Sequence, residues 1–408
     1  MKVLQINTIA GTGSTGRITE DILEMLLSHG KDGCIAVSID NSSENYANKV
    51  YQIGQKTYSR YFHALAARFT DRCGFFSSTA TQELITYVQE EKFDIIHLHN
   101  LHGYYINLPI LINELNRMSV KIVWTFHDCW PITGHCTYFD YVGCMKWKTQ
   151  CNQCQQKSKY PKSIIIDRSK KNYLDKKRLF NKLDCVIVTP SKWLKTVCKQ
   201  SFLAKKTIEV IPNGVDLKTF YPRETSHLRE RYGLENKFVV MAVSARWMMY
   251  DPDDRKGLKD IIELSKILDD TYQIVIVGFL NDKAMKGLPK NIMGVKRTNS
   301  LEELAEWYSL GDVFINPTKE EVLGMVNIES LACGTPVLTY DSGGSPETIT
   351  NETGMVIKKG DIRELAKAIK KCKHNNFTRD DCIQRAQNYE KLACYERYYD
   401  LYQRILNS

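Results

Sequence analysis

The sequence predicts an α/β protein made of two doubly wound domains, and three observations predict this class. Short apolar, β-rich runs recur along the whole chain with amphipathic stretches between them, which is typical of parallel sheets covered on both faces. The length of 408 residues allows two or three domains with large cores. The apolar and charged fractions, 43% and 25%, are those of globular proteins.

The expected strands fall into two groups along the chain. Those of the first half are Lys2–Asn7, Cys34–Ile39, Val50–Ile53, Asp94–His99, Val120–Phe126 and Cys185–Pro190. Those of the second half are Phe238–Ser244, Gln273–Val277, Val313–Asn316, Val337–Tyr340 and Met355–Ile357. Apolar residues with helical spacing also predict one helix from Leu258 to Leu268 and another from about Ser300.

A domain boundary is expected at Ile211–Pro222, where an Asn-Gly turn lies between two prolines. We therefore place one domain at 1–212 and a second at 213–388. The remaining residues, 389–408, are rich in tyrosine and are expected to form a helix. Two doubly wound domains that face each other across a cleft would bind their ligand there, at the carboxyl ends of both sheets.

Basic residues are concentrated in Lys146–Lys206. This segment holds 17 Lys and Arg and three acids, a net charge of +14, which leaves −5 for the rest of a chain whose total is +9. Such a surface favours phosphate-rich partners, namely the anionic inner leaflet of a membrane, a lipid pyrophosphate or nucleic acid. An ordinary solvated helix face is the alternative interpretation.

The first residues and the cysteines together indicate a compartment. Met1–Asn7 lacks a long apolar core, so we expect no secretory signal. The 13 cysteines of a large chain without such a signal then indicate the reducing cytosol.

Four cysteines lie close together in an expected insertion at about 129–160 of the first domain. They are Cys136, Cys144, Cys151 and Cys154. Four thiols ending in a CxxC pair predict a closed structural zinc site that orders the insertion. A redox pair at Cys151 and Cys154, or thiols with no common role, are the alternatives.

Two glutamates, Glu321 and Glu329, stand eight positions apart on either side of Gly324. A helix beginning near Gly324 would direct its free N–H groups toward an anion. The two carboxylates would then lie up to about 12 Å apart, the length of a sugar diphosphate with its ribose. Carboxylates bind hydroxyl groups, whereas the helix end binds phosphate.

Gly11, Gly13 and Gly16 form a GTGSTG sequence with the spacing of a dinucleotide-binding loop, and Asp40 ends the next expected strand. A nicotinamide-dependent dehydrogenase is therefore one interpretation. Three residues, Thr8 to Ala10, separate the expected strand from Gly11, which is looser than the usual turn. A glycine-rich loop before a helix can also hold the diphosphate of another ligand.

Two basic residues of the second domain lie at the ends of expected elements. Arg246 follows the strand Phe238–Ser244, and Lys256 precedes the helix that begins after Gly257. Two fixed cations can neutralise a bound diphosphate, as a metal ion does at other phosphate sites. Surface ion pairs are the alternative.

Histidines follow two expected strands of the first domain. His127 comes after Val120–Phe126, at a carboxyl end where open sheets bind ligands. His99, Asn100 and His102 end the preceding strand, where they either line an acceptor site or have a packing role.

The segment Asn316–Glu347 resembles the paired-glutamate signature of the family 4 glycosyltransferases with the GT-B fold, and especially their colanic-acid and capsule-type members. The resemblance extends over nearly the whole chain. It implies retaining transfer of a sugar from a UDP- or GDP-sugar to a saccharide or a polyprenyl-pyrophosphate-linked acceptor in capsule, exopolysaccharide or O-antigen assembly. It also implies a last helix that crosses back to the first domain. From the cysteines and the basic segment we expect a cytoplasmic protein, peripheral on the membrane.

The resemblance also assigns roles to residues. Glu321 would bind the donor-sugar hydroxyls, which His127 also faces, and Glu329 would bind the ribose. Arg246 and Lys256 would neutralise the leaving diphosphate, so that the chemistry would require no metal or other cofactor. Further donor contacts are expected from Gly13, Ser14, Thr15, Gly16, Arg297, Val322, Leu323, Gly324, Met325 and Val326. Two other functions stay open, a nucleotide-sugar epimerase on the same fold and a zinc-containing nucleic-acid-binding protein. We expect no nucleic-acid partner, because the basic run lacks a recognisable module with stacking aromatics.

Overall fold

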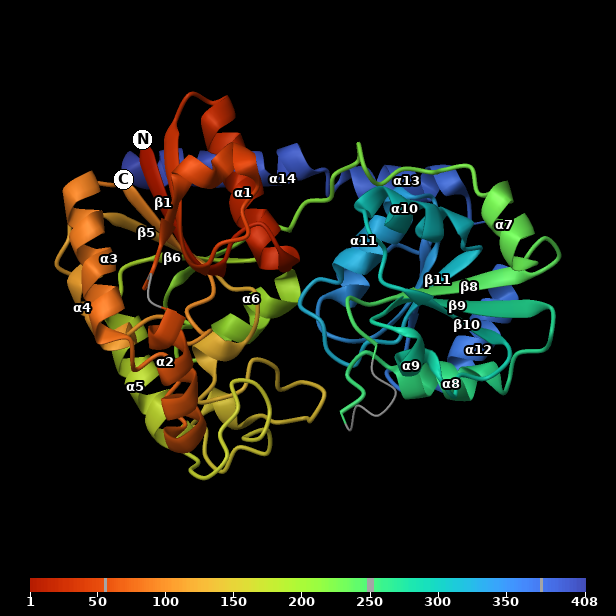
Figure 1. Cartoon of the computed structure of the whole chain (residues 1–408), viewed down its shortest axis with the longest axis horizontal. Coiled ribbons are helices and arrows are strands. Elements are labelled where there is room, and N and C mark those ends of the chain that lie inside the picture. Colours follow the sequence, from red (N-terminus) through yellow and green to blue (C-terminus); the bar gives the residue numbers. More distant parts are fainter. Residues whose placement is uncertain (55–56, 248–252, 375–376) are drawn as a thin grey trace. The chain divides into compact units, whose positions relative to one another are not determined.

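The computed structural model describes residues 1–54, 57–247, 253–374 and 377–408 (Figure 1). The chain divides into two compact units. The N-terminal unit comprises Met1–Pro212 and Cys394–Ser408, and the C-terminal unit comprises Asn213–Ala393. Each unit is built around one parallel sheet.

The N-terminal unit has a seven-stranded sheet in the order β3-β2-β1-β4-β5-β6-β7. Its strands are β1 (Lys2–Ile9), β2 (Asp32–Ile39), β3 (Val50–Gln52), β4 (Ile95–Leu98), β5 (Lys121–Thr125), β6 (Val186–Thr189) and β7 (Thr207–Val210). The chain goes from β1 to β2 on one side and later to β4 on the other, so the strand order reverses between β1 and β4. Ligands of open parallel sheets bind at such a reversal, beyond the carboxyl ends of the strands.

The C-terminal unit has a six-stranded sheet in the order β10-β9-β8-β11-β12-β13. Its strands are β8 (Phe238–Val243), β9 (Tyr272–Phe279), β10 (Ile292–Lys296), β11 (Val313–Asn316), β12 (Val337–Tyr340) and β13 (Gly354–Ile357). The order reverses between β8 and β11. This reversal lies beside the loop that carries Glu321.

Helices connect the strands of both sheets. Those of the N-terminal unit are α1 (Gly13–Ser28), α2 (Thr57–Thr70), α3 (Ser78–Glu91), α4 (Leu108–Leu115), α5 (Ser169–Lys182) and α6 (Lys192–Lys199), with short turns η1 (Glu44–Lys49), η2 (Trp130–Ile132) and η3 (Lys146–Lys148). Those that begin in the C-terminal unit are α7 (Ser226–Tyr232), α8 (Leu258–Ser265), α9 (Asp282–Met285), α10 (Leu301–Leu310), α11 (Met325–Ala332), η4 (Ser345–Thr348), α12 (Ile362–Cys372), α13 (Arg379–Gln387) and α14 (Lys391–Leu406).

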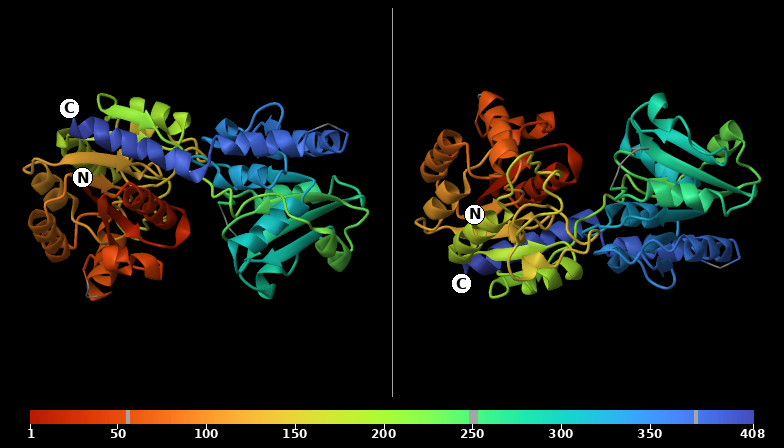
Figure 2. Two further views of the ribbon diagram at one scale, coloured as in Figure 1. Left: turned by 90° about the horizontal axis from the view of Figure 1, so that it is seen from above. Right: turned by 90° about the horizontal axis from the view of Figure 1, so that it is seen from below.

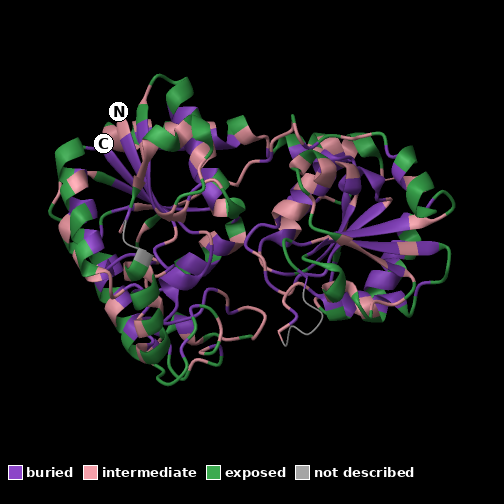
Figure 3. Ribbon diagram, in the orientation of Figure 1, coloured by how far each residue is buried: buried purple, intermediate pink, exposed green. Residues whose placement is uncertain are grey.

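The buried strands explain why the sheets form. Every residue of β11 and of β12 is buried, as expected for parallel strands covered on both faces (Figure 3). Two strands were not predicted, β7 and β10. Both lie at sheet edges and carry exposed or half-buried charged residues, so their sequences lack a continuous apolar run.

The last helix, α14, completes the core of the N-terminal unit. Its buried residues Tyr395, Tyr398, Leu401 and Tyr402 pack in one cluster with apolar residues of β1, α1, β4, β5 and β6. Figure 2 shows α14 lying across this unit. The chain thus leaves the N-terminal unit after Pro212 and returns to it at Cys394.

Within the described part of the chain, no helix is both long and apolar enough to cross a membrane.

Candidate active site

A glycine turn connects β11 to α11 and positions Glu321. Gly324 caps α11 with a φ of +78°, a conformation that favours glycine. The first N–H groups of α11 have no partner inside the helix, so this end attracts anions. The turn is held by Gly343, where an added Cβ would lie 1.7 Å from the Glu321 carbonyl oxygen. The neighbouring Gly344 N–H donates to that same oxygen at 3.0 Å.

Glu321 pairs with Lys256, another of the predicted catalytic residues. The Lys256 ammonium lies 2.7 Å from a carboxylate oxygen of Glu321. Burial alone would raise the pKa of Glu321, but the positive charge and hydrogen bond of Lys256 bring it below its ordinary value. Glu321 is therefore ionised at neutral pH. Its side chain is 21% exposed, which leaves it accessible to a ligand.

Buried amides hold the loop after β11 against the loop after β12. The Asn316 amide donates to the Asn327 side-chain oxygen at 2.8 Å, and the Asn327 amide donates to the Thr348 hydroxyl at 3.0 Å. All three residues are buried. Because buried hydrogen-bonded networks rigidify their surroundings, the start of α11 is preorganised.

Two buried serines lie in the loop that packs on this helix end. The hydroxyl oxygens of Ser342 and Ser345 have no hydrogen-bond partner among the described residues, although both side chains are almost fully buried. A Cβ on Gly324 would meet the Ser345 hydroxyl at 2.9 Å, which places that hydroxyl against the turn. Buried hydroxyls in proteins nearly always have a partner, so these two are candidate donors to a bound polar group.

Glu329, the second predicted glutamate, lies within α11, in the turn that follows the start of the helix. The Tyr308 hydroxyl donates to its carboxylate at 2.8 Å, and Tyr308 itself is buried in the core of the unit. The Tyr308 bond orients a carboxylate that is only half-buried.

The other predicted donor contacts have different surroundings. Val322 and Leu323 are buried in the turn, while Met325 and Val326 are half-buried in the first turn of α11. Arg246 and Arg297 are exposed at the carboxyl ends of β8 and β10. The expected spacer between Arg246 and Lys256 includes residues 248–252, which lie outside the described residues.

In the N-terminal unit the glycine loop is tighter than the sequence suggested. Strand β1 continues to Ile9, so only Ala10 separates it from Gly11, and the expectation of three intervening residues was wrong. Gly11 has a φ of +74° and leaves no room for a Cβ, which would lie 1.8 Å from the Asn41 carbonyl oxygen. Gly13, Ser14, Thr15 and Gly16 then form the first turn of α1.

His99 and His127 meet at the carboxyl ends of β4 and β5. Nδ1 of His99 lies 2.9 Å from Nε2 of His127, and Nε2 of His99 lies 3.2 Å from the Gln5 side-chain oxygen. The Gln5 amide nitrogen donates to the Thr19 carbonyl, which fixes that oxygen toward His99. His99 therefore donates to Gln5 and accepts from His127, and Nδ1 of His127 is left as a hydrogen-bond acceptor.

Burial keeps these imidazoles neutral. It lowers the pKa of His127 to about 4, and it lowers the pKa of His99 well below its ordinary value. His102 instead bonds Asp128 at 2.7 Å and the Tyr160 hydroxyl at 2.9 Å. Asn100 is half-buried, and its carbonyl accepts from Tyr105.

The predicted cysteine cluster gathers without forming a ligand set. A hydrogen bond joins Cys136 and Cys154, and the Gly134 N–H donates to the sulfur of Cys151 at 3.2 Å. Across the described ranges, no group of three or more His, Cys, Asp or Glu side chains is arranged to hold a metal ion. The described cysteines, Cys144 among them, are all free thiols. This geometry does not support the zinc site, which stays a prediction.

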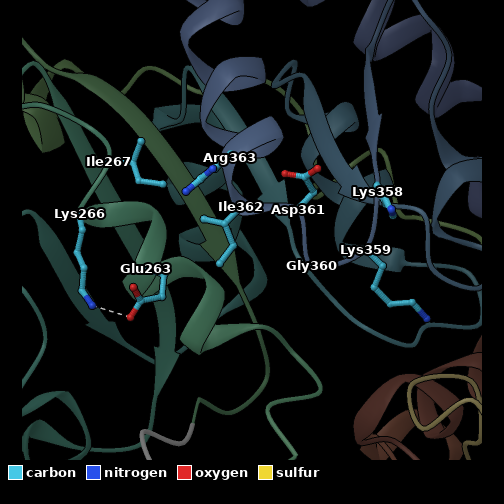
Figure 4. A pocket seen from close by; sticks show the side chains of 9 residues that line it. All are labelled: Glu263, Lys266, Ile267, Lys358, Lys359, Gly360, Asp361, Ile362 and Arg363. Carbon is cyan, nitrogen blue, oxygen red and sulfur yellow. Dashed lines mark hydrogen bonds and ion pairs between the residues drawn. The ribbon is translucent and has the colours of Figure 1, made fainter.

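A pocket of about 560 Å³ lies elsewhere in the C-terminal unit, between α8 and the start of α12 (Figure 4). It is lined by Glu263, Lys266, Ile267 and the segment from Lys358 to Arg363. It contains none of the predicted site residues, and the loop at α11 remains the candidate site.

Comparison with known proteins decides the family. The family model described as "Glycosyltransferase Family 4" matches residues 42–219, and the one described as "Glycosyl transferases group 1" matches residues 251–389. The chain is a family 4 glycosyltransferase. With its two parallel-sheet domains it has the GT-B fold, and it acts in polysaccharide biosynthesis.

Similar proteins agree with this assignment. The glycosyltransferase is 24% identical to WcaC of Escherichia coli K12, a protein named for glycosyl transfer in colanic acid biosynthesis, over 68% of this chain and 67% of that protein. It is 22% identical to an uncharacterized protein of the cps region of Klebsiella pneumoniae, over 82% of this chain and 85% of that one. The structure of Anabaena HepE with UDP shares the fold, with a TM-score of 0.69, 16% identity and coverage of 98% and 99%.

Sequence reasoning missed two residues of the site, Ser342 and Ser345. Both belong to the DSGGSPE segment, but only the structure shows that their hydroxyls are buried without described partners. The family assignment gives no support to the dehydrogenase, epimerase and nucleic-acid interpretations.

Proposed function

We propose that this glycosyltransferase moves a sugar from a UDP- or GDP-sugar, with retention at the anomeric carbon, to a hydroxyl of a saccharide carried on a polyprenyl pyrophosphate. The observation that carries the proposal is the arrangement of groups at the start of α11. There a free helix end, the Lys256–Glu321 pair and the buried hydroxyl of Ser345 belong to one loop system. Anabaena HepE, which has the same fold, was solved with UDP and with UDP-glucose.

The start of α11 suits the donor diphosphate. Helix N-termini attract phosphate through their free N–H groups and positive dipole end. The unpartnered hydroxyls of Ser342 and Ser345 can donate to phosphate oxygens, and bound donor would relieve the cost of burying them unpaired. Arg246, exposed at the end of β8, adds a second cation beside Lys256 in this proposal.

Glu321 suits the donor sugar because it is ionised and half-buried. An ionised carboxylate accepts strong hydrogen bonds from sugar hydroxyls. When the C1–O bond to the diphosphate breaks, Lys256 stabilises the leaving group. The acceptor oxygen then bonds to C1 on the same face, and its proton passes to the departing phosphate oxygen. Removing one such stabilising contact costs about 3 kcal/mol, or at least about a hundredfold in rate.

His127 supplies a hydrogen-bond acceptor from the N-terminal unit. Its Nδ1 lone pair stays available because the proton of His127 is on Nε2, which donates to Nδ1 of His99. A neutral imidazole accepts a sugar O–H without adding charge. We assign His127 to the donor sugar, and Asn100 and His102 to the acceptor side.

The decisive experiment combines a ligand screen with two serine variants. The melting temperature is measured with UDP-, GDP- and ADP-sugars, and we expect one nucleotide series to raise it. Ser345→Ala should leave the melting temperature of the free protein unchanged or higher, because it removes an unpaired buried hydroxyl, and should weaken binding of the nucleotide diphosphate about tenfold.

Ser330→Ala is the matched control. The Ser330 hydroxyl is buried too, but it donates to the Thr335 carbonyl at 3.0 Å. Its loss should lower the melting temperature and leave nucleotide affinity unchanged. The proposal fails if no nucleotide sugar stabilises the protein, or if Ser345→Ala binds the nucleotide as tightly as the parent.

A further inference from the structure

Two buried carboxylates share the ammonium of Lys319, which lies two residues before Glu321. Nζ of Lys319 is 2.8 Å from a carboxylate oxygen of Asp254 and 3.1 Å from one of Asp260. Burial alone would lower the pKa of Lys319, but its hydrogen bonds to Asp254 and Asp260 raise it, so the ammonium stays charged. Both aspartates are buried, and a buried carboxylate needs such a counter-charge.

The same carboxylates connect Lys319 to two further elements. The second oxygen of Asp260, in the first turn of α8, accepts from the Tyr340 hydroxyl at 2.9 Å. Tyr340 is the last residue of β12 and is fully buried. We call Lys319, Asp254, Asp260 and Tyr340 the Lys319 network. It joins the loop after β11 to the loop before α8 and to the end of β12.

Backbone contacts join the same two loops. The Lys319 N–H donates to the Arg255 carbonyl at 2.8 Å. An added Cβ on Gly257 would lie only 2.3 Å from the Pro317 carbonyl oxygen, so the two loops pack directly against each other. The loop before α8 carries Lys256, and the loop after β11 carries the carboxylate that pairs with it.

The backbone of Asp254 is strained. Its φ of +43° is a left-handed conformation that few residues with a side chain adopt. The Asp254 carboxylate also accepts from the Lys259 N–H at 3.1 Å, and its carbonyl accepts from the Gly257 N–H at 3.0 Å. Such strain persists only where the surroundings hold it, and it is concentrated at functional sites. The ion pair with Lys319 is one of the contacts that hold this turn, two residues before Lys256.

The relative position of Lys256 and Glu321 matters for transfer, because a displacement of about 1 Å can cost about a hundredfold in rate. We propose that Lys319 is a positioning residue for transfer, which fixes Lys256 relative to Glu321 through Asp254 and Asp260. Lys319 acts through the two loops and does not contact the donor. The proposal rests on the proposed function, which gives Lys256 and Glu321 their roles.

The first test measures release of UDP or GDP from the nucleotide sugar that stabilises the protein, with water as the acceptor. Lys319→Met should lower this rate at saturating donor about tenfold or more, because Lys256 is displaced from its position. Nucleotide affinity should fall less than about threefold, because the cation is displaced and not removed. Lys319→Arg, which keeps the charge, should restore the rate to within about threefold of the parent.

Asp254→Asn is a second variant that keeps the local backbone. Asparagine tolerates a left-handed φ, and its side-chain oxygen can still accept from the Lys259 N–H. Only the charge opposite Lys319 is lost. The rate should fall in the same direction as in Lys319→Met, and a rate equal to that of the parent in both variants would overturn the proposal.

Arg229→Met is the matched control. The Arg229 guanidinium, in α7, lies 3.0 Å from the Asp312 carboxylate, and its side chain is 25% exposed against 24% for Lys319. This variant should lower the melting temperature and leave the rate per folded molecule unchanged. If it loses as much rate as Lys319→Met, the effect is general destabilisation and the proposal is overturned.

A double-mutant cycle separates positioning from a general loss of structure. In the Lys256→Ala protein no pair is left to position, so adding Lys319→Met should lower the residual rate less than about twofold. An equal loss with and without Lys256→Ala would overturn the proposal.

Hydrogen exchange tests the Lys319 network without any ligand. Lys319→Met should speed exchange at the amides of residues 257 and 319 about tenfold or more, while the amides of β9 exchange as in the parent. If Lys256→Ala and Glu321→Ala react as fast as the parent, the proposed function fails, and the positioning role fails with it. If those two variants lose activity but Lys319→Met changes neither exchange nor rate, the positioning role alone is overturned.

Discussion

The ammonium of Lys256, just before α8, is held 2.7 Å from the carboxylate of Glu321, in the loop after β11. The pair joins two loops that follow neighbouring strands, β8 and β11. It keeps a negative charge and a positive charge together at the place where we propose that a sugar and a phosphate separate.

This pair gives the first prediction. Glu321→Ala should lower the transfer rate by more than about a hundredfold, because it removes a contact to the reacting sugar, and should leave nucleotide affinity within about threefold. Lys256→Ala should reduce both the transfer rate and the nucleotide affinity, since it removes a cation that contacts the diphosphate in our proposal. Steady-state kinetics and nucleotide titration measure the two effects separately. Lys266→Ala, which breaks the exposed pair with Glu263, is the control and should change neither. Equal losses of rate and affinity in Glu321→Ala would reassign that residue.

The second prediction concerns Glu329 and the ribose. Glu329→Ala should weaken nucleotide binding about tenfold or more, because a carboxylate that accepts from ribose hydroxyls is lost. Tyr308→Phe removes the 2.8 Å bond that orients Glu329 and should have a smaller effect in the same direction. The parent should also bind a 2′-deoxynucleotide more weakly than the ribonucleotide. If Glu329→Ala still discriminates between these two nucleotides as the parent does, the ribose assignment is wrong.

The third prediction is a dependence of stability on pH. Burial lowers the pKa of His127 to about 4 from its ordinary 6.5, so the unfolded chain binds a proton that the folded chain does not hold between these values. The contribution to stability is complete above pH 6.5 and is lost as the pH falls toward 4. His127→Gln should therefore show a smaller drop in melting temperature between pH 7 and pH 5 than the parent does. If the melting temperatures of both proteins change with pH in the same way, burial does not lower the pKa of His127.

The fourth prediction tests the zinc site expected from the sequence. If Cys136, Cys144, Cys151 and Cys154 hold zinc, the purified protein should contain one zinc per chain. A chelator should then lower the melting temperature more than it lowers the transfer rate, since the site is structural. Elemental analysis that finds no zinc would remove the hypothesis.

The sequence predicted the two sheets because buried parallel strands are continuous apolar runs. Val313–Asn316 and Val337–Tyr340 have the predicted bounds. The edge strands β7 and β10 could not be found this way, since their partly exposed residues include Glu209 and Lys296. The helix predicted to reach Leu268 ends at Ser265, because its last apolar residues lie in the turn that follows.

The site was predictable only in part. Glu321 and Gly324 were recognisable from their spacing and from the turn that a glycine allows. Ser345 was not, because an unpaired buried hydroxyl is a property of tertiary packing and has no local pattern. The exposure of the apolar side of α2 could not be predicted for a similar reason. Apolar residues at helical spacing predict that one side of a helix is apolar, and such a side is normally buried. Only the structure shows that His63, on the opposite side, is buried and that the apolar side faces solvent.

The packing of α14 has a consequence for synthesis of this protein. Tyr398 and Tyr402 bond Thr125 and His97, so the final residues supply part of the interior around β4 and β5. The core of the N-terminal unit is thus completed only after the C-terminal unit has been synthesised. A nascent chain synthesised only as far as Pro212 lacks α14, which completes the core of the N-terminal unit. A fragment truncated at Pro212 should therefore be prone to aggregation and need chaperones.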